Sequence, residues 1–234
     1  MNYETRLING FRVFGFETSE SLIEYIKKSP SILIAANGEK IYSQNTELKN
    51  ISLTNVGYAD GIGAVVALRK KGLKGAVRIP GSELWLKLIS TLHYDHSFYL
   101  IGSTTEVINE VVKLLRLQFP KIKILGYRNG YLSNDEDEML LEDEIQKMKP
   151  DVILVAQGSP RQELLMQRLQ RSHEAIYMGL GGSFDVYTGA TKRAPKIFRD
   201  FGLEWFYRLL SQPSRLRRYK VLLPFAVNVI RGKY

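Results

Sequence analysis

The chain has 234 residues, of which 44% are hydrophobic and 24% are charged, and these proportions are typical of a globular protein rather than a disordered or fibrous one. A chain of this length forms one large domain or two small ones, and it can bury a core without disulfide support. It contains no cysteine, so disulfides, thiolate metal sites and cysteine nucleophiles are excluded.

The net charge of +9 lies in the last part of the chain. From residue 191 onward there are eleven lysines and arginines and two acids, whereas the first 190 residues carry 22 basic and 22 acidic side chains. A basic segment on a neutral body predicts an anionic partner, which is nucleic acid, anionic lipid or a phosphate group.

No targeting or membrane-spanning segment is expected from the sequence. The first residues, MNYETRLINGFRVFGFE, lack the basic and apolar regions of a secretory signal. No stretch reaches 18 uninterrupted apolar residues. The expected location is therefore the cytoplasm.

Short apolar runs alternate with longer helical patterns along the first 190 residues. The runs rich in Val, Ile and Leu are expected to be strands buried on both faces of a parallel sheet, and they lie at 31–37, 97–103, 122–127, 151–159 and 175–182. The expected helices lie at 19–29, 39–49, 61–71, 82–93, 104–119, 134–148 and 160–172. This alternation predicts an α/β fold with crossover connections.

Two of these helices carry finer signals. The helix expected at 104–119 has a possible N-cap at Thr104 or Thr105. Its apolar face is expected to consist of Val107, Val111, Leu114, Leu115 and Phe119. The segment 134–148 opens with acids, which the helix dipole favours, and these acids are expected to be solvated.

The body is expected to end at residue 190, and residues 191–234 are expected to form a basic, amphipathic helical appendage. Pro195 is expected to open a helix that continues to Leu210, and Pro213 is expected to end it. A second segment, SRLRRYKVLLPFAVNVIRGKY, has a basic head and an apolar middle broken by Pro224. Its composition fits contact with an anionic membrane surface, and it also fits docking of the apolar face on the body.

Three of the expected strands run directly into glycine-rich turns, which read LIGS (100–103), AQGSPRQE (156–163) and GLGGSFDVYTG (179–189). Ligands of open α/β sheets bind beyond the carboxyl ends of the strands, and helix N-termini there favour phosphate. The turns therefore predict a phosphate-bearing ligand, although each one alone also fits ordinary turn chemistry. None matches a P-loop or a dinucleotide fingerprint, which counts against ATP hydrolysis and dinucleotide chemistry.

Charged residues stand at three other turns. Asp60, in YADGIGAV, follows an apparent strand and suits either a helix N-cap or a general base toward a hydroxyl. Arg78, in VRIPGSELW, suits either a bidentate phosphate contact or an ion pair with a nearby acid. His93, Asp95 and His96 form only a weak metal pattern, and surface histidines are the expected interpretation.

Six blocks of the sequence occur in the order known from one enzyme family. They read YADGIGAV, RIPGSELW, GYRNGY, AQGSPRQELLM, GLGGSFDVYTGATKRAPK and GLEWFYRLLSQPSRLRR. From about residue 9 to residue 218 the chain therefore resembles the WecG/TagA/CpsF glycosyltransferases, glycosyltransferase family 26. The string EWFYRLLSQPSR brings it closest to the WecG-like members, which make the second lipid intermediate of enterobacterial common antigen.

The resemblance implies a Rossmann-like parallel sheet flanked by helices, with a C-terminal appendage that completes the active site at the membrane. It implies an inverting enzyme, without metal or other cofactor, that moves a sugar from UDP to the GlcNAc 4-hydroxyl of a polyprenyl-diphosphate-linked acceptor. WecG-like members use UDP-N-acetylmannosaminuronate, and TagA-like members use UDP-N-acetylmannosamine. Such an enzyme would be peripheral on the inner face of the plasma membrane, would bind no nucleic acid and could form a homo-oligomer.

The resemblance also assigns roles to single residues of this chain. It makes Asp60 the general base, places Arg78 near the diphosphate or the acceptor, and makes Gln162 a hydrogen-bond partner of sugar or phosphate. Arginines of the tail would stabilise the leaving UDP in place of a metal. The expected UDP- and substrate-binding set is Asn37, Gly102, Asn129, Gly158, Gly181, Gly182, Asp185, Arg208, Arg215 and Arg218.

The chain departs from the TagA-like pattern at the run AANGE (35–39). TagA-like members carry a threonine at the position of Ala35, and the missing hydroxyl favours the uronate over the neutral sugar. A uronate carboxylate requires a cation, for which Arg161 and Arg193 are candidates. Two other classes remain as alternatives: a nucleic-acid-binding module that uses the basic tail, and an NAD-type oxidoreductase on the same fold.

Overall fold

The computed structural model describes residues 3–132, 134–192, 194, 195, 198, 207 and 222–233. The chain divides into two compact units. The first consists of Met1–Ser21, Ala35–Pro80 and Lys192–Tyr234, and the second consists of Leu22–Ile34 and Gly81–Thr191.

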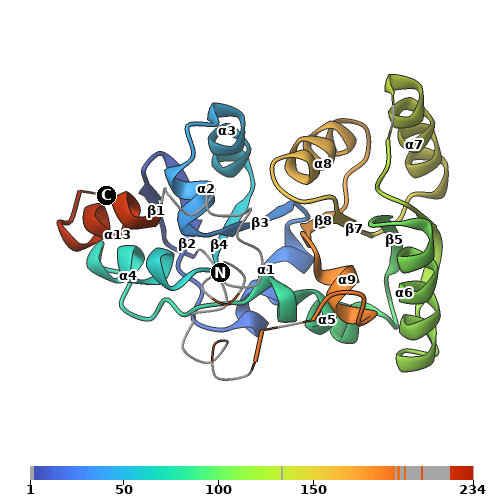
Figure 1. Ribbon diagram of the computed structural model, residues 1–234, viewed down its shortest axis with the longest axis horizontal. Coiled ribbons are helices and arrows are strands. Elements are labelled where there is room, and N and C mark those ends of the chain that lie inside the picture. Colours follow the sequence, from blue (N-terminus) through green and yellow to red (C-terminus); the bar gives the residue numbers. More distant parts are fainter. Residues whose placement is uncertain are drawn as a thin grey trace. The chain divides into compact units, whose positions relative to one another are not determined.

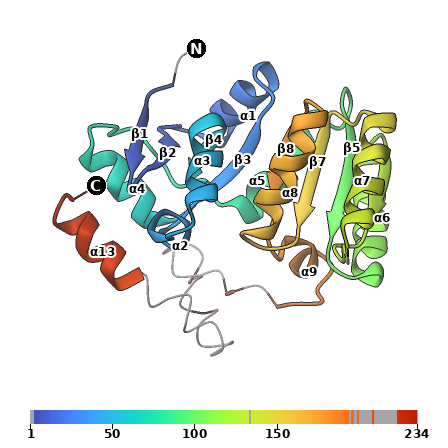
Figure 2. The ribbon, with the colours of Figure 1, turned by 90° about the horizontal axis from the view of Figure 1, so that it is seen from above.

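Within the described part of the chain, eight strands form one sheet, and its strands can be followed in Figures 1 and 2. They are β1 (Thr5–Ile8), β2 (Phe11–Phe14), β3 (Ile32–Ala36), β4 (Val56–Ala59), β5 (Ser97–Gly102), β6 (Lys123–Arg128), β7 (Val152–Ala156) and β8 (Ile176–Gly179). Their order is β1-β2-β4-β3-β8-β7-β5-β6. Strands β1 and β2 form an antiparallel hairpin, and the pairs β2–β4, β3–β8, β8–β7, β7–β5 and β5–β6 are parallel. The predicted α/β fold with a mostly parallel sheet is thus confirmed.

The first unit contains the hairpin, β4 and four complete helices among its described residues. These helices are α2 (Gly38–Tyr42), α3 (Thr46–Thr54), α4 (Ile62–Lys70) and α13 (Leu222–Ile230). The single helix expected at 39–49 is wrong, because the Asn45 side chain accepts a hydrogen bond from the N–H of Leu48 and so caps a new helix. The hairpin was not expected, since each of its strands has only four residues.

The second unit contains β5 to β8, the first three residues of β3 and five complete helices among its described residues. These helices are α5 (Gly81–Leu92), α6 (Thr105–Gln118), α7 (Asp135–Met148), α8 (Arg161–Ser172) and α9 (Ser183–Tyr187). Helix α1 (Ser19–Lys28) begins in the first unit and continues in the second. All five residues of β7 are buried, as expected for a strand covered on both faces. Burial raises the pKa of the Tyr177 phenol on β8 well above its ordinary value, so this side chain stays neutral in the core.

Helix α6 confirms one detail of the sequence analysis and corrects another. The Thr104 hydroxyl accepts a hydrogen bond from the N–H of Val107 at 3.3 Å, so the predicted N-cap is present. The buried residues of the helix are Ile108, Val111, Val112 and Leu115. Val107 and Leu114 are only half-buried, so the predicted apolar face was rotated, because α6 packs on β5, β6 and α9 together.

Strand β6 also differs from expectation. It lies at the end of the sheet and pairs with β5, and Leu125 and Tyr127 remain 41% and 40% exposed. The prediction of a strand buried on both faces is therefore wrong for 122–127. An apolar run cannot distinguish an edge strand from a central one, because the strand order depends on pairing between distant segments.

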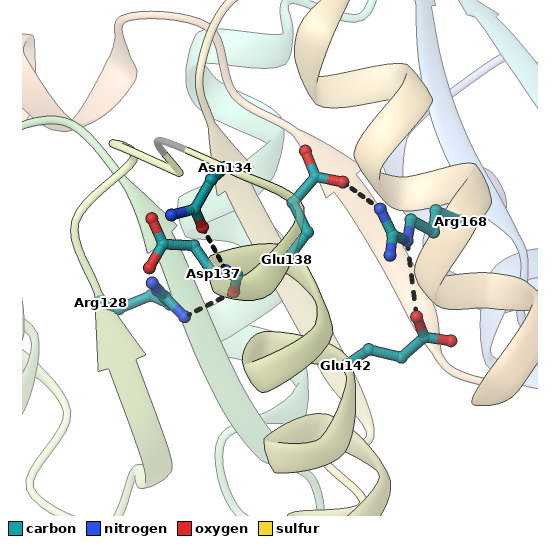
Figure 3. A network of polar contacts seen from close by, with 6 residues as sticks. All are labelled: Arg128, Asn134, Asp137, Glu138, Glu142 and Arg168. Atoms are coloured by element: carbon teal, nitrogen blue, oxygen red, sulfur yellow. Dashed lines mark hydrogen bonds and ion pairs between the residues drawn. The ribbon is translucent and has the colours of Figure 1, made fainter.

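A polar network holds α7 against its neighbours in the second unit (Figure 3). Arg168 of α8 forms ion pairs with Glu138 and Glu142 of α7. Asn134 caps α7 by accepting from the N–H of Asp137, and the carbonyl of Asp137 accepts from Arg128 of β6. The acidic start of this helix was expected to be solvated; this is wrong for Glu138, which the ion pair holds half-buried.

The C-terminal segment is described in part. Pro224 lies in the first turn of α13, where its missing N–H costs nothing, so the predicted break at this proline is wrong. The helix expected from Pro195 to Leu210 lies almost wholly outside the described residues. Within the described part of the chain, no helix is both long and apolar enough to cross a membrane.

Candidate functional site

In the first unit, the turns that follow β3 and β4 lie side by side. The backbone N–H groups of Asp60 and Gly61 both donate to the carbonyl of Ala36, at 3.1 and 3.2 Å. A Cβ added to Gly61 would lie 3.3 Å from both Cα and Cβ of Asn37. These contacts bring Asn37 and Asp60, which lie 23 positions apart in the sequence, to one edge of the sheet.

Asp60 directly follows β4 and is half-buried. The N-cap of α4 is Gly61, which has no side chain to cap the helix. The N-cap interpretation of Asp60 is therefore wrong. A carboxylate placed two residues before Ile62, the first residue of α4, suits the other interpretation, a base toward a hydroxyl.

Arg78 lies at the same turn. Its Nε donates to the backbone carbonyl of Asp60 at 3.0 Å, and the next residue, Ile79, donates its N–H to the carbonyl of Ala59 at 2.8 Å. The backbone bond fixes the segment along the end of β4, and the side-chain bond holds the guanidinium beside the acidic turn. A cation held in this way can bind an anionic group of a ligand.

Asn37 directly follows β3. Its Oδ1 accepts from the N–H of Lys40 at 3.0 Å and so caps α2. Ala35, the position of the missing hydroxyl, lies within β3 and is half-buried. The first unit thus presents a carboxylate, a guanidinium and an amide within two adjoining turns.

In the second unit, the loops after β5, β6 and β7 are tied to one another by backbone and amide groups. The N–H of Ser103 donates to the carbonyl of Ala156 at 3.2 Å. The N–H of Gly130 donates to the carbonyl of Ser103 at 2.9 Å, and its own carbonyl accepts from Gln157 Nε2 at 2.8 Å. Gly102 has φ of +144°, and a Cβ there would lie 2.5 Å from the carbonyl oxygen of Ala156, so only glycine fits.

Two predicted residues, Asp185 and Asn129, take part in these loops. Asp185 lies in α9 and its Oδ1 accepts from the Ser103 hydroxyl at 2.8 Å. Asn129 donates to the Thr105 hydroxyl and accepts from the N–H of Tyr131, each at 3.0 Å. Ser103 was missed by the sequence analysis, although a hydroxyl that directly follows the glycine of a strand end is a signal that the sequence contains.

Gln162 is buried beneath the turn that follows β8. Its side chain is 3% exposed. Its Oε1 accepts from the N–H of Gly181 at 2.9 Å, and its Nε2 donates to Glu163 at 3.0 Å. Both ends of the amide are therefore used inside the unit, and Gln162 positions the turn at Gly181. Direct contact of Gln162 with a ligand stays a prediction.

Gly158 and Gly181 border open space in the described structure. Their φ angles are +76° and +58°, and no described atom lies within 4 Å of a Cβ added to either residue. Gly182 is exposed, and a Cβ there would lie 3.9 Å from Asp185 Oδ2. Open space beside Gly158 and Gly181 leaves room for a ligand such as a phosphate, while the N–H of Gly181 itself is held by Gln162.

The predicted residues thus fall into two groups. Asn37, Asp60 and Arg78 belong to the first unit, and Gly102, Asn129, Gly158, Gln162, Gly181, Gly182 and Asp185 belong to the second. Arg161 is exposed at the start of α8. The tail residues Arg193, Arg208, Arg215 and Arg218 lie outside the described residues.

In the structure, His93 of the weak metal pattern does not lie at the surface as expected. His93 is buried, and its Nδ1 lies 3.2 and 3.0 Å from the carbonyls of Ile89 and Ser90. The expectation of a surface histidine is therefore wrong for His93, whose ring packs on Tyr94 and Phe119. No group of three or more His, Cys, Asp or Glu side chains arranged to hold a metal ion is present among the described residues.

A comparison with known protein families gives a match that includes residues of both units. The family model described as "Glycosyl transferase WecG/TagA/CpsF family" matches residues 10–234.

Proposed function

Because the chain belongs to the WecG/TagA/CpsF glycosyltransferase family, we propose that it transfers N-acetylmannosaminuronate from UDP to the GlcNAc of a polyprenyl-diphosphate-linked acceptor. Membership of the family makes the protein a glycosyltransferase that uses a sugar donor and an acceptor. The observation that carries the finer proposal is the hydrogen bond from Arg78 Nε to the backbone carbonyl of Asp60, which holds a guanidinium beside the carboxylate-bearing turn at the end of β4.

In the proposed step, the Asp60 carboxylate removes the proton from the acceptor 4-hydroxyl. The acceptor oxygen then forms a bond to the anomeric carbon of the donor sugar. The bond from that carbon to the β-phosphate oxygen breaks, and UDP leaves with the electron pair. Attack from the face opposite UDP inverts the anomeric centre and gives a β-linkage.

We assign the UDP portion of the donor to the glycine turns of the second unit. Backbone N–H groups near Gly158 and Gly182 can approach a diphosphate closely because no Cβ stands in the way, and Gln162 holds the Gly181 N–H that shapes the turn. Asp185 accepts from Ser103 and retains a second carboxylate oxygen for a hydroxyl of the ligand.

Residues 1–190 form the catalytic body in this proposal, and residues 191–234 form the appendage that completes the active site. Arg208, Arg215 and Arg218 would offset the charge that develops on the leaving UDP, which is the task that a metal performs in other transferases. The high density of basic residues beyond position 190 would also hold the protein at an anionic membrane surface on the cytoplasmic side.

The preference for the uronate donor rests on Ala35 and on the cations of the chain. An alanine at this position offers no hydroxyl to a neutral sugar, and the exposed Arg161 at the start of α8 is a candidate partner for a donor carboxylate. If the preference is wrong, the alternative within the same family is UDP-N-acetylmannosamine, the donor of teichoic acid or capsule pathways.

The test is a transfer assay on a short-chain polyprenyl-diphosphate-GlcNAc, with each UDP sugar offered separately and EDTA present throughout. Product from the uronate alone is the expected result. Product from N-acetylmannosamine alone would contradict the proposed donor and keep the reaction. Absence of product from both donors, with anionic vesicles supplied, would contradict the proposed acceptor.

A further inference from the structure

Ser103 joins the loops at the carboxyl end of the strands in the second unit. It directly follows β5, and its N–H, its carbonyl and its hydroxyl are all engaged. The N–H donates to the carbonyl of Ala156 at the end of β7, and the carbonyl accepts from the N–H of Gly130 in the loop after β6. The hydroxyl donates to Asp185 of α9. A single residue therefore connects the ends of β5 and β7, the loop after β6 and α9.

The backbone of Ser103 has a conformation that favours glycine. Its φ is +56°, in the left-handed region that other residues rarely adopt. The surrounding structure has to hold such a conformation, and residues of this kind cluster at functional sites. A glycine would make both backbone hydrogen bonds without strain. What serine adds is the hydroxyl, so its contact with Asp185 is the feature that explains the residue type.

This hydroxyl sets the orientation of the Asp185 carboxylate. Oδ1 accepts from Ser103 Oγ at 2.8 Å. Oδ2 lies on the side of the exposed Gly182, where a Cβ added to that glycine would lie 3.9 Å from it. Within the described part of the chain Oδ2 makes no hydrogen bond, and a carboxylate oxygen has two acceptor positions. An acceptor of fixed direction thus faces the turn to which we assign UDP.

The ribose of UDP carries donors that match this acceptor. An ionised carboxylate can only accept a hydrogen bond, and the ribose offers two neighbouring hydroxyls that donate. In dinucleotide-binding α/β folds, an acidic side chain at the ligand site accepts from a ribose hydroxyl in this way. The phosphate groups of UDP carry the same charge as the carboxylate and are repelled by it. Asp185 therefore suits the ribose rather than the diphosphate.

We propose that Ser103 is a positioning residue for the nucleotide, whose hydroxyl holds Asp185 Oδ1 so that Oδ2 is directed toward a ribose hydroxyl of UDP. The proposal rests on the proposed function, because it takes UDP as the nucleotide. Ser103 does not touch the nucleotide in this account and acts through Asp185.

The test compares the affinities of UDP, 2′-deoxy-UDP and 3′-deoxy-UDP, measured by calorimetry on the full chain. In the wild type, we expect at least one deoxy form to bind at least fivefold more weakly than UDP, because a hydrogen bond to a charged group is lost. In Ser103→Ala, we expect UDP to bind about as weakly as that deoxy form. The affinity of the deoxy form itself should stay within twofold of its wild-type value.

A second variant separates positioning from stability. Ser103→Gly also lacks the hydroxyl, but glycine adopts a φ of +56° without strain, so this variant should be more stable than Ser103→Ala. We expect both variants to lose the same affinity for UDP although their melting temperatures differ.

Ser97→Ala is the matched control. Ser97 is the first residue of β5, and its hydroxyl donates to Asp151 Oδ2 at 2.6 Å, so a similar pair lies at the other end of the same strand. This variant should lose stability with no change in the affinity for UDP or for the deoxy forms.

Equal affinities of the wild type for all three nucleotides would overturn the proposal and leave the proposed function standing. Wild-type discrimination in Ser103→Ala would overturn it as well, and so would a loss of UDP affinity that follows the melting temperatures of the two Ser103 variants. Absence of UDP binding by the wild type would count against the proposed function and would overturn this proposal with it.

Discussion

The turns that follow β3 and β4 carry an amide and a carboxylate at Asn37 and Asp60, whereas the turns that follow β7 and β8 contain glycines with open space beside them among the described residues. Asp60, Arg78 and Asn37 stand at two adjoining turns of the first unit. In the second unit, Ser103, Asn129 and Gln157 directly follow β5, β6 and β7, and Gly158 and Gly181, in the turns after β7 and β8, have positive φ and open space beside them among the described residues. The side chains near these glycines, above all Gln162, are used to hold the turns in shape.

This difference indicates a division of tasks between the units. Side chains that carry charge can move a proton or attract a reacting group, whereas backbone N–H groups held in a fixed array bind an anion without taking part in proton transfer. In the proposed reaction, the first unit therefore supplies the base and the second unit supplies the diphosphate site. Each of the following variants changes one side of this comparison.

The largest effect on turnover is expected from Asp60→Asn. General base catalysis contributes roughly 10² to 10⁴ in rate, so loss of the carboxylate should lower turnover at least tenfold. The side chain keeps its size, so the melting temperature should stay within a degree or two of the wild-type value. Near-normal turnover in the folded variant would remove Asp60 from the role of base.

Gly102→Ala should be the most damaging change in the second unit for stability. The new Cβ would lie 2.5 Å from the carbonyl oxygen of Ala156 and 2.6 Å from its Cβ, and the backbone at φ of +144° disfavours any side chain. Overpacking and strain of this kind cost roughly 1–3 kcal/mol each. Urea unfolding measures the loss, and Gly158→Ala, which meets no described atom within 4 Å, is the control with the smaller expected effect.

Gln162→Ala should weaken UDP binding together with stability. It leaves the N–H of Gly181 and the buried Glu163 without the amide that each now contacts. Loss of a buried partner costs roughly 1–3 kcal/mol. Calorimetry with UDP and thermal unfolding give the two readouts. A variant of normal stability that binds UDP poorly would indicate that Gln162 contacts the ligand directly.

Arg168→Ala should lower stability with no change in UDP affinity. The guanidinium pairs with Glu138 and Glu142 and so ties α8 to α7 (Figure 3). All three side chains are about one-quarter to one-third exposed, so the expected loss is about 1 kcal/mol. Glu142→Gln, which retains the size of the side chain, should lose less. A marked change in UDP affinity would contradict the view that this network only supports the fold.

The smallest expected effect is a pH dependence of the free energy of unfolding. It comes from Ser97 and Asp151, which hydrogen-bond to each other at the amino ends of β5 and β7. Burial raises the pKa of Asp151, but hydrogen bonds from the Ser97 hydroxyl and N–H outweigh it and leave the pKa below its ordinary value. Because the pKa of Asp151 is lower in the folded state than in the unfolded state, where it is about 3.9, the carboxylate stabilises the fold at pH values above about 3.9. This contribution is lost as the pH falls through the pKa of the folded state.

Ser97→Ala should therefore cost about 1 kcal/mol at neutral pH. The difference from wild type should shrink as the pH falls below about 4. Urea unfolding at pH 7 and pH 3 checks this expectation, and a difference that is constant across the two values would contradict it.

Much of the fold follows from local signals in the sequence. The cap at Thr104, the helix at 134–148 and the apolar run of β7 depend on residues close together in the chain, and the structure contains all three. The turn at Asp60 was also correctly placed between a strand and a helix.

What the sequence could not supply depends on contacts between distant segments. A Cβ added to Gly63 would lie 2.4 Å from the ring of Phe225, 162 positions later, so the need for this glycine becomes visible only when the two segments are placed together. The exposure of Leu125 depends on β6 lying at the end of the sheet. Likewise, Ser103 gains its importance from Asp185, to which no local pattern connects it.

The most direct test of the division between the units is the affinity for UDP of wild type, Asp60→Asn and Gln162→Ala, measured by calorimetry on the full chain. The account predicts that Asp60→Asn binds UDP within about twofold of wild type while turnover falls at least tenfold, and that Gln162→Ala binds UDP at least fivefold more weakly. Loss of UDP binding in Asp60→Asn, with normal binding in Gln162→Ala, would contradict it.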